Sequence, residues 1–191
     1  MNPIFYLLLL FFLLLLLHCF ITSHATILMQ TQTCTSPITV EDACRGAVDG
    51  HPGAVAYDYC VSSLNSDPRS RSADLHGLAV LATKLAIDHV ASTESKIDEL
   101  MDLEPTPTIK DGFNACLEVY SDAVDRLRDA LDNLNSRLYA KAVELLAKAL
   151  GASEDCQEVF RGSEAAPPVM VEDRDYGKLA SIALGIAASV E

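Results

Sequence analysis

Cysteine carries the clearest chemistry in this chain, because two thiols at a suitable separation form a disulfide. Cys116 and Cys156 lie twenty positions on either side of Ser136. If two helices fold back at Ser136, each arm of 20 residues rises about 30 Å and both thiols reach the same height. The spacing therefore predicts a disulfide between two antiparallel helices, far from the turn that joins them.

Three further cysteines lie outside the apolar N-terminal run that contains Cys19. A bond between Cys44 and Cys60 would close a loop of about 16 residues, worth roughly 3 kcal/mol in the chain-entropy model. Cys34 then has no partner, which indicates a free thiol or an intermolecular disulfide that would make a covalent dimer. No Cys-x-x-Cys occurs and no His lies at zinc-finger spacing, so structural disulfides are favoured over a metal site.

Other residue types give no catalytic pattern. The sequence has no G-x-S-x-G elbow, no H-E-x-x-H and no phosphate-binding glycine loop. His76 and His89 lie 13 positions apart on different turns of one expected helix, and His89 falls on its apolar stripe, which favours a core or interface role. Acids between 118 and 132 fall mostly between apolar positions, which favours a solvated face over an acidic docking surface or paired-carboxylate catalysis. We therefore expect a binding protein and not an enzyme, with no cofactor and no metal.

The first 25 residues are typical of a secretory signal peptide. An apolar run from Phe5 to Leu17 is followed by Ser23-His24-Ala25, a small-x-small sequence of the kind that signal peptidase cleaves. The alternative is an uncleaved membrane anchor, because the run is long and no Lys or Arg precedes it. The small residues at its exit favour cleavage, so we expect a secreted, extracellular protein in an oxidising compartment, with no membrane contact after the signal is removed.

Removal of residues 1–25 leaves about 165 residues, enough for one domain with a core. The removed segment has no Asp, Glu, Lys or Arg, so the mature chain keeps the formal net charge of -13. That charge argues against nucleic acid, whose phosphates need Lys and Arg. We expect a flexible N-terminus over residues 26–40 and one domain over residues 41–191.

The domain has the periodicity of packed helices. Residues 41–70 are predicted to form a hairpin of two short helices, separated by the breaker Asp49–Gly53. Residues 71–191 contain four longer patterns with apolar residues three and four positions apart. The second pattern runs from Phe113 to Leu134, and the third from Leu138 to Val159. Short connections make sequential helices antiparallel neighbours, so we predict an all-α, up-down-up-down four-helix bundle with an N-terminal helical hairpin.

The turn between the second and third long helices is the tip, residues 135–139. Its residues are Asn135, Ser136, Arg137, Leu138 and Tyr139. The tip presents a cation and two bulky groups at the end of a rigid arm. An ordinary turn and a contact loop for a partner protein are both compatible with this composition.

Five segments in order resemble the plant invertase and pectin methylesterase inhibitors, and the match covers roughly residues 40–190. Residues 57–64 follow Y-x-x-C-x-x-x-L, residues 116–123 follow C-x-x-x-Y-x-x-A, and residues 156–160 follow C-x-x-x-F. Residues 179–186 resemble the last helix of the family. Residues 73–89 are similar to the invertase inhibitors of the plane-tree pollen allergen type.

The resemblance implies disulfides Cys44–Cys60 and Cys116–Cys156. It also implies a secreted, apoplastic inhibitor that binds a cell-wall carbohydrate enzyme, acid invertase or pectin methylesterase, and blocks its active site by stoichiometric, non-covalent docking. Invertase-directed members often carry Pro-Lys-Phe at the tip, whereas this chain has Ser136-Arg137-Leu138 and then Tyr139, without the proline. Pectin methylesterase inhibitors dock mainly through the side of the bundle.

Two other function classes fit a disulfide-linked helical protein. One is a carrier of lipid or another small molecule inside the bundle, although the alanine-rich third and fourth helices leave little room between neighbours. The other is a storage or allergen-type protein without a dedicated enzyme target. The sequence leaves the choice of target, the tissue and the oligomeric state open.

Overall fold

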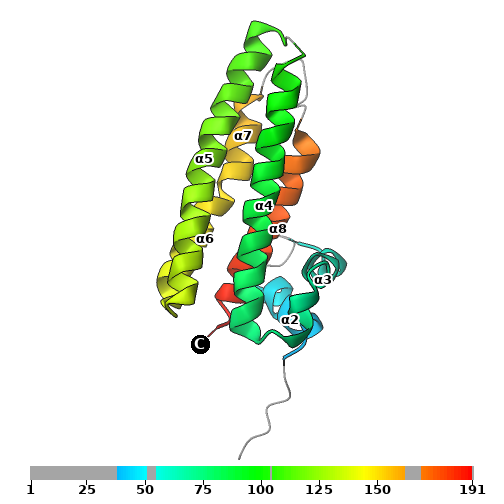
Figure 1. Ribbon diagram of the computed structural model, residues 1–191, viewed down its shortest axis with the longest axis vertical. Coiled ribbons are helices and arrows are strands. Elements are labelled where there is room, and N and C mark those ends of the chain that lie inside the picture. Colours follow the sequence, from blue (N-terminus) through cyan, green and yellow to red (C-terminus); the bar gives the residue numbers. More distant parts are fainter. Residues whose placement is uncertain (1–37, 51–54, 104, 162–168, 191) are drawn as a thin grey trace, which may run out of the picture. The chain divides into compact units, whose positions relative to one another are not determined.

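The computed structural model describes residues 38–50, 55–103, 105–161 and 169–190 (Figure 1). Every regular element in these ranges is helical and none is a strand, which confirms the all-α class. The expected signal peptide at residues 1–25, the rest of the N-terminus to residue 37 and Cys34 lie outside the described residues. No described helix combines the length and apolarity that a membrane span requires.

The N-terminal hairpin consists of α2 (Val40–Gly50) and α3 (Tyr57–Asn65), followed by the 3-10 helix η1 (Pro68–Ser72). Helix α2 begins one residue earlier than the sequence predicts. Its start is fixed by Thr39, whose Oγ1 accepts the backbone N–H of Asp42 at 3.1 Å and donates to the Asp42 carboxylate at 2.8 Å. This reciprocal pair satisfies a free backbone donor of the first turn. The Cys44–Cys60 disulfide then joins the two helices, with Cα atoms 5.7 Å apart.

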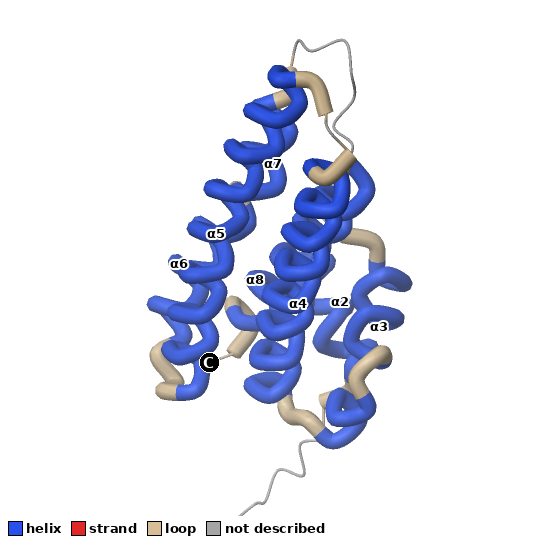
Figure 2. Tube along the Cα trace, turned by 45° about the horizontal axis from the view of Figure 1, so that its top comes forward, coloured by secondary structure: helices blue, strands red, loops and turns tan. Residues whose placement is uncertain are grey.

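The bundle consists of α4 (Leu75–Met101), α5 (Pro107–Asn135), α6 (Tyr139–Leu150), α7 (Ala152–Val159) and α8 (Met170–Ala187). Helix α5 packs against α4, α6 and α7, and α8 packs against α4, α6 and α7 (Figure 2). This closed set of neighbours confirms the up-down-up-down bundle, with α6 and α7 together forming its third arm.

The third arm differs from the single helix that the sequence predicts, because it divides at Gly151. The backbone N–H of Gly151 bonds to the carbonyl of Ala149, which tightens the last turn of α6 before α7 starts at Ala152. Glycine lowers the helical preference of an interior position by up to ~1 kcal/mol relative to alanine. The apolar stripe continues across the break, which is why periodicity alone did not predict it.

Small residues bring the helices close at three places. A Cβ atom added at Gly185 of α8 would lie 2.8 Å from Cβ of Ala47 in α2. At Gly177 it would lie 2.9 Å from Oγ of Ser153, and at Gly112 it would lie 2.6 Å from the ring of Phe160. Glycine at these positions therefore permits the approach of α2 and α7 to α8, and of α5 to the end of α7.

The Cys116–Cys156 disulfide joins α5 to α7, with Cα atoms 4.8 Å apart and both side chains fully buried. Most of the predicted stripe of α5 is buried along the length of the helix, including Phe113, Tyr120, Leu127 and Leu134. The two ends of the third predicted stripe are exceptions, because Leu138 is 57% exposed and Val159 is 40% exposed.

Candidate functional site

The tip closes α5 with a glycine-type cap that has arginine in the glycine position. Arg137 has a φ of 58°, the left-handed region, and is alone in this among the non-glycine residues that the structure describes. Its N–H bonds to the carbonyl of Leu134 at 2.8 Å, and the N–H of Leu138 bonds to the carbonyl of Asn133 at 2.8 Å. These two bonds form the Schellman motif, in which glycine usually occupies the left-handed position because other residues pay about 1 kcal/mol there.

The side chains of the tip differ in their exposure to solvent. Asn135 is the last residue of α5 and Ser136 is its C-cap, and both are exposed. Arg137 and Leu138 are also exposed, whereas Tyr139, the first residue of α6, is half-buried. The tip thus offers a guanidinium and an adjacent leucine side chain to solvent at a backbone position that is fixed by its hydrogen bonds.

Tyr139 connects the tip to the start of α4. An Arg137 Nη atom donates to the Tyr139 hydroxyl oxygen at 3.1 Å. The same hydroxyl lies 3.3 Å from Nδ1 of His76, and the two rings meet edge to face with centroids 5.9 Å apart. In the sequence, His76 had no expected role beyond its place on the first long helix, and the structure brings it to the tip.

The other residues with possible chemistry have structural partners. Nε2 of His89 lies 2.7 Å from the backbone carbonyl oxygen of Glu172, which agrees with the predicted interface role. On α5, Asp122 pairs with Arg126 at 3.4 Å and Asp125 pairs with Arg128 at 3.6 Å, all on the exposed face. The described residues contain no cluster of His, Cys, Asp and Glu suited to a metal ion.

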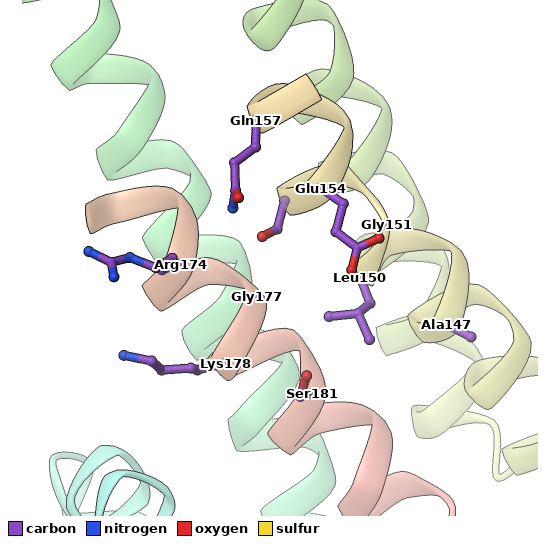
Figure 3. A pocket seen from close by; sticks show the side chains of 10 residues that line it. Ala147, Leu150, Gly151, Glu154, Gln157, Arg174, Gly177, Lys178 and Ser181 are labelled. Atoms are coloured by element: carbon purple, nitrogen blue, oxygen red, sulfur yellow. The ribbon is translucent and has the colours of Figure 1, made fainter. Parts of the chain in front are cut away.

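An open groove of about 600 Å³ lies along α8 where α8 faces α6 and α7 (Figure 3). Arg174 and Lys178 extend from one side of α8, away from α6 and α7, whereas Leu150 and Glu154 lie on the opposite wall. Lys178 donates to Asp175 at 2.8 Å, and its Nζ lies 4.7 Å from the centroid of the Tyr59 ring. The groove is therefore a mixed-charge surface on the side of the bundle, and its walls are not those of an apolar lipid cavity.

A buried polar cluster that the sequence did not indicate connects three helices. The carboxylate of Asp173 is 1% exposed and accepts the hydroxyl of Tyr120 at 2.7 Å and the amide of Gln157. Burial raises the pKa of Asp173 above its ordinary value, and the two donated hydrogen bonds partly oppose that rise. Burial also raises the pKa of Tyr120, as does the neighbouring Asp173 charge. The Tyr120 hydroxyl and both carboxylate oxygens of Asp173 have hydrogen-bond partners, so the cluster fixes α5, α7 and α8 together.

Comparison with known proteins identifies the family. The sequence pattern of the plant invertase/pectin methylesterase inhibitors matches residues 31–186. The chain belongs to this family. The resemblance noted in the sequence is confirmed, and with it the expectation of an enzyme inhibitor that is not itself an enzyme.

Relatives within the invertase/pectin methylesterase inhibitor family include proteins named as inhibitors of invertase or fructosidase and proteins named as inhibitors of pectinesterase. A "Putative invertase inhibitor" from Platanus acerifolia is 33% identical over 161 residues, 84% of this chain and 89% of the relative. The "Cell wall / vacuolar inhibitor of fructosidase 2" of Arabidopsis thaliana is 30% identical over 81% of this chain and 83% of its own length. A "Pectinesterase inhibitor" of Actinidia deliciosa is 32% identical over 108 residues, 56% of this chain and 58% of the relative.

A solved structure shares the bundle of this inhibitor. The crystal structure of a mutant form of a pectin methylesterase inhibitor from Arabidopsis superposes with a TM-score of 0.67. The match covers 81% of this chain and 99% of the other, at 19% sequence identity. At that identity the likeness establishes the fold and leaves the target open.

Proposed function

We propose that this protein is a secreted inhibitor of apoplastic acid invertase, which it binds through the tip by one-to-one, non-covalent docking that blocks the active site. The observation that carries the proposal is the tip itself. Arg137 and Leu138 are exposed side by side, at a turn whose backbone is held by the Leu134 and Asn133 carbonyls. A preformed contact loses less conformational entropy on binding than a flexible one.

The chemistry of the tip suits the active site of a glycoside hydrolase. Such enzymes use a pair of carboxylates around the scissile bond. A guanidinium offers a planar set of donors that matches a carboxylate better than other cations do. Arg137 would meet the carboxylates, while Leu138 would fill an adjoining apolar part of the cleft. The target is therefore proposed to be an enzyme with an acidic cleft that is just wide enough to admit one helical turn.

The names of several relatives support this choice of target. Two proteins from Platanus and one from Arabidopsis thaliana are named as inhibitors of invertase or fructosidase, and the match covers 77% to 84% of this chain. The cell-wall or vacuolar role in the Arabidopsis name also supports the proposed location in the apoplast. The signal peptide expected at residues 1–25 and the two disulfides fit the same location.

A second candidate target is pectin methylesterase, bound through the side of the bundle. The groove along α8 favours it, because this accessible surface on the side of the bundle carries Arg174 and Lys178 on α8 and the apolar Leu150 on its opposite wall. The small-molecule carrier is not favoured, since close approach at Gly112, Gly177 and other glycines brings the helices of the bundle together.

The experiment is a titration of two purified enzymes, acid invertase and pectin methylesterase, with the mature protein whose disulfides are intact. We expect invertase activity to fall linearly to near zero at one equivalent of inhibitor. Failure to inhibit either enzyme at micromolar inhibitor would overturn the function. Inhibition of pectin methylesterase alone would overturn the choice of target and support the second candidate.

Tip variants test the binding surface within the same titration. We expect Arg137→Ala and Leu138→Ala each to weaken invertase inhibition by about 1–3 kcal/mol, the range of central interface residues. Matched controls are Arg128→Ala, an exposed arginine on α5, and Leu103→Ala, a leucine 76% exposed between α4 and α5. Equal inhibition by tip and control variants would show that invertase binds another surface.

A further inference from the structure

The hydroxyl of Tyr139 lies between two groups that are remote in the sequence. Arg137 donates to it at 3.1 Å, and Nδ1 of His76 lies 3.3 Å from it, although His76 and Tyr139 are 63 positions apart. His76 is the second residue of α4, whose first turn is fixed by the Asp74 carboxylate, an acceptor for the N–H of Gly77 at 2.8 Å. The flexible guanidinium is thus attached, through one tyrosine, to a well-anchored helix start.

The direction of these hydrogen bonds depends on the charge of His76. When the imidazole is neutral with Nδ1 unprotonated, Arg137 donates to the Tyr139 oxygen and Tyr139 donates to Nδ1. All donors then point the same way, and such a chain strengthens each of its bonds. When Nδ1 binds a proton it becomes a donor, so two cations must donate to one phenol oxygen.

Other charged groups near the start of α4 have no hydrogen bond to the Tyr139 hydroxyl among the described residues. The charged residues of the segments around the start of α4 are Asp74 at the N-cap of α4, Arg69 and Arg71 on η1, Asp132 at the end of α5, and Lys141 on α6, the helix that begins with Tyr139. Asp74 is bound to Gly77, Arg69 pairs with Asp67, and Lys141 pairs with Glu144 at 3.0 Å. The described end of α8, residues 179–190, has no charged side chain. Among the described residues, Arg137 is the charged group that shares a hydrogen-bond partner with the His76 ring.

We propose that His76 is a positioning residue for the tip: its neutral ring holds Tyr139, Tyr139 holds the Arg137 guanidinium, and protonation of His76 releases the guanidinium. The inhibitor thereby presents Arg137 in one orientation while the His76 ring is neutral and in several once the ring is protonated. The consequence for binding rests on the proposed inhibition of invertase. The hydrogen-bonded chain itself does not, and it is present in the free protein.

The first test is NMR spectroscopy of the free mature protein. The Nε–Hε resonance of Arg137 is followed from about pH 5 to pH 8, the range in which imidazoles titrate, beside the ring carbons of His76. We expect the Arg137 resonance to move with the same midpoint as the His76 ring. In Tyr139→Phe, which removes only the hydroxyl, we expect the His76 titration to remain and the Arg137 response to be lost. An Arg137 resonance that ignores the His76 titration, or that still follows it in Tyr139→Phe, would overturn the proposal.

The second test compares inhibition by the wild-type protein and by His76→Gln at the two ends of that pH range. Glutamine retains an acceptor for Tyr139 but does not titrate. The ratio of the two affinities for one enzyme cancels the pH dependence of the enzyme itself. We expect this ratio to change several-fold, with the wild type relatively weaker where the His76 ring is protonated. A ratio that is equal at both pH values would assign His76 a merely structural role. If no enzyme is inhibited, the NMR result still decides the proposal.

Discussion

The Cα atoms of Cys116 and Cys156 lie 4.8 Å apart across α5 and α7, although forty positions separate the two residues in the chain. The loop that this disulfide closes contains the whole tip. Because the tip lies at the middle of the loop, the cross-link restricts the two arms that carry it without contacting the proposed binding residues. The disulfide can therefore be removed to change rigidity while the tip sequence remains intact.

Removal of this disulfide is expected to destabilise the protein more than removal of the other one. In the chain-entropy model, the 40-residue loop contributes about 4 kcal/mol and the 16-residue loop about 3 kcal/mol. We predict that Cys116→Ser/Cys156→Ser lowers the free energy of unfolding by about 4 kcal/mol in chemical denaturation. Cys44→Ser/Cys60→Ser is the matched comparison. If only Cys44→Ser/Cys60→Ser lost stability, the predicted contribution of the disulfide between α5 and α7 would be contradicted.

Replacement of Arg137 by glycine separates stability from binding. Glycine adopts a φ of 58° without the steric cost that arginine pays. We predict that Arg137→Gly raises the free energy of unfolding by up to about 1 kcal/mol while it weakens invertase inhibition. Thermal denaturation and enzyme titration measure the two effects. Ser136→Gly is the control, because Ser136 has a negative φ of -87° and gains nothing from glycine. A destabilised Arg137→Gly protein would show that the arginine backbone is not strained.

The contact between Gly185 and Ala47 holds the N-terminal hairpin against α8. A Cβ at Gly185 would lie 2.8 Å from Cβ of Ala47 and 3.0 Å from its Cα, and the backbone cannot move aside cheaply. We predict that Gly185→Val lowers the free energy of unfolding by about 1–3 kcal/mol, as overpacked cores do. Gly46→Ala is the control, since its nearest neighbour, Oγ of Ser189, would lie at an ordinary 3.8 Å. Equal stability of the two variants would contradict the close packing of α2 on α8.

The buried carboxyl of Asp173 makes stability depend on pH. Because burial raises its pKa in the folded protein, folding favours the protonated form, and this contribution is lost as the pH rises through the folded pKa. We predict that wild-type stability falls more between about pH 4 and pH 7 than that of Asp173→Asn, in urea denaturation at each pH. The exposed Asp88→Asn provides the control. A steeper fall in Asp173→Asn than in the wild type would reverse the sign of the effect and refute it.

The helical architecture could be predicted because it follows from local patterns. The alternation of three and four positions from Phe113 to Leu134 fixes the face of α5 that packs inward, and Phe113, Tyr120, Leu127 and Leu134 on that stripe are buried. The spacing of cysteines around Ser136 correctly indicated the α5–α7 pairing. The break at Gly151 was missed, although a glycine inside a helical pattern is a recognised sign of an interruption.

The geometry of the tip could be predicted only in part. Its position followed from the meeting of two helical patterns, but Leu138 continues the apolar spacing and is nevertheless exposed, because α6 begins one residue later. The left-handed Arg137 has no sequence signature, since glycine or asparagine is expected there. Contacts between distant segments, such as His76 with Tyr139 and Tyr120 with Asp173, depend on the orientation of each helix about its own axis in the packed bundle. The role of the tip in binding stays a prediction.

The measurement that tests the central claim most directly is calorimetric titration of acid invertase with the mature inhibitor and with Arg137→Ala/Leu138→Ala. The account predicts one-to-one binding of the wild-type protein. It also predicts a large loss of affinity in the double tip variant, and wild-type affinity in the control Arg128→Ala/Leu103→Ala. Binding of the tip variant with wild-type affinity, or no binding of the wild-type protein to invertase, would contradict it.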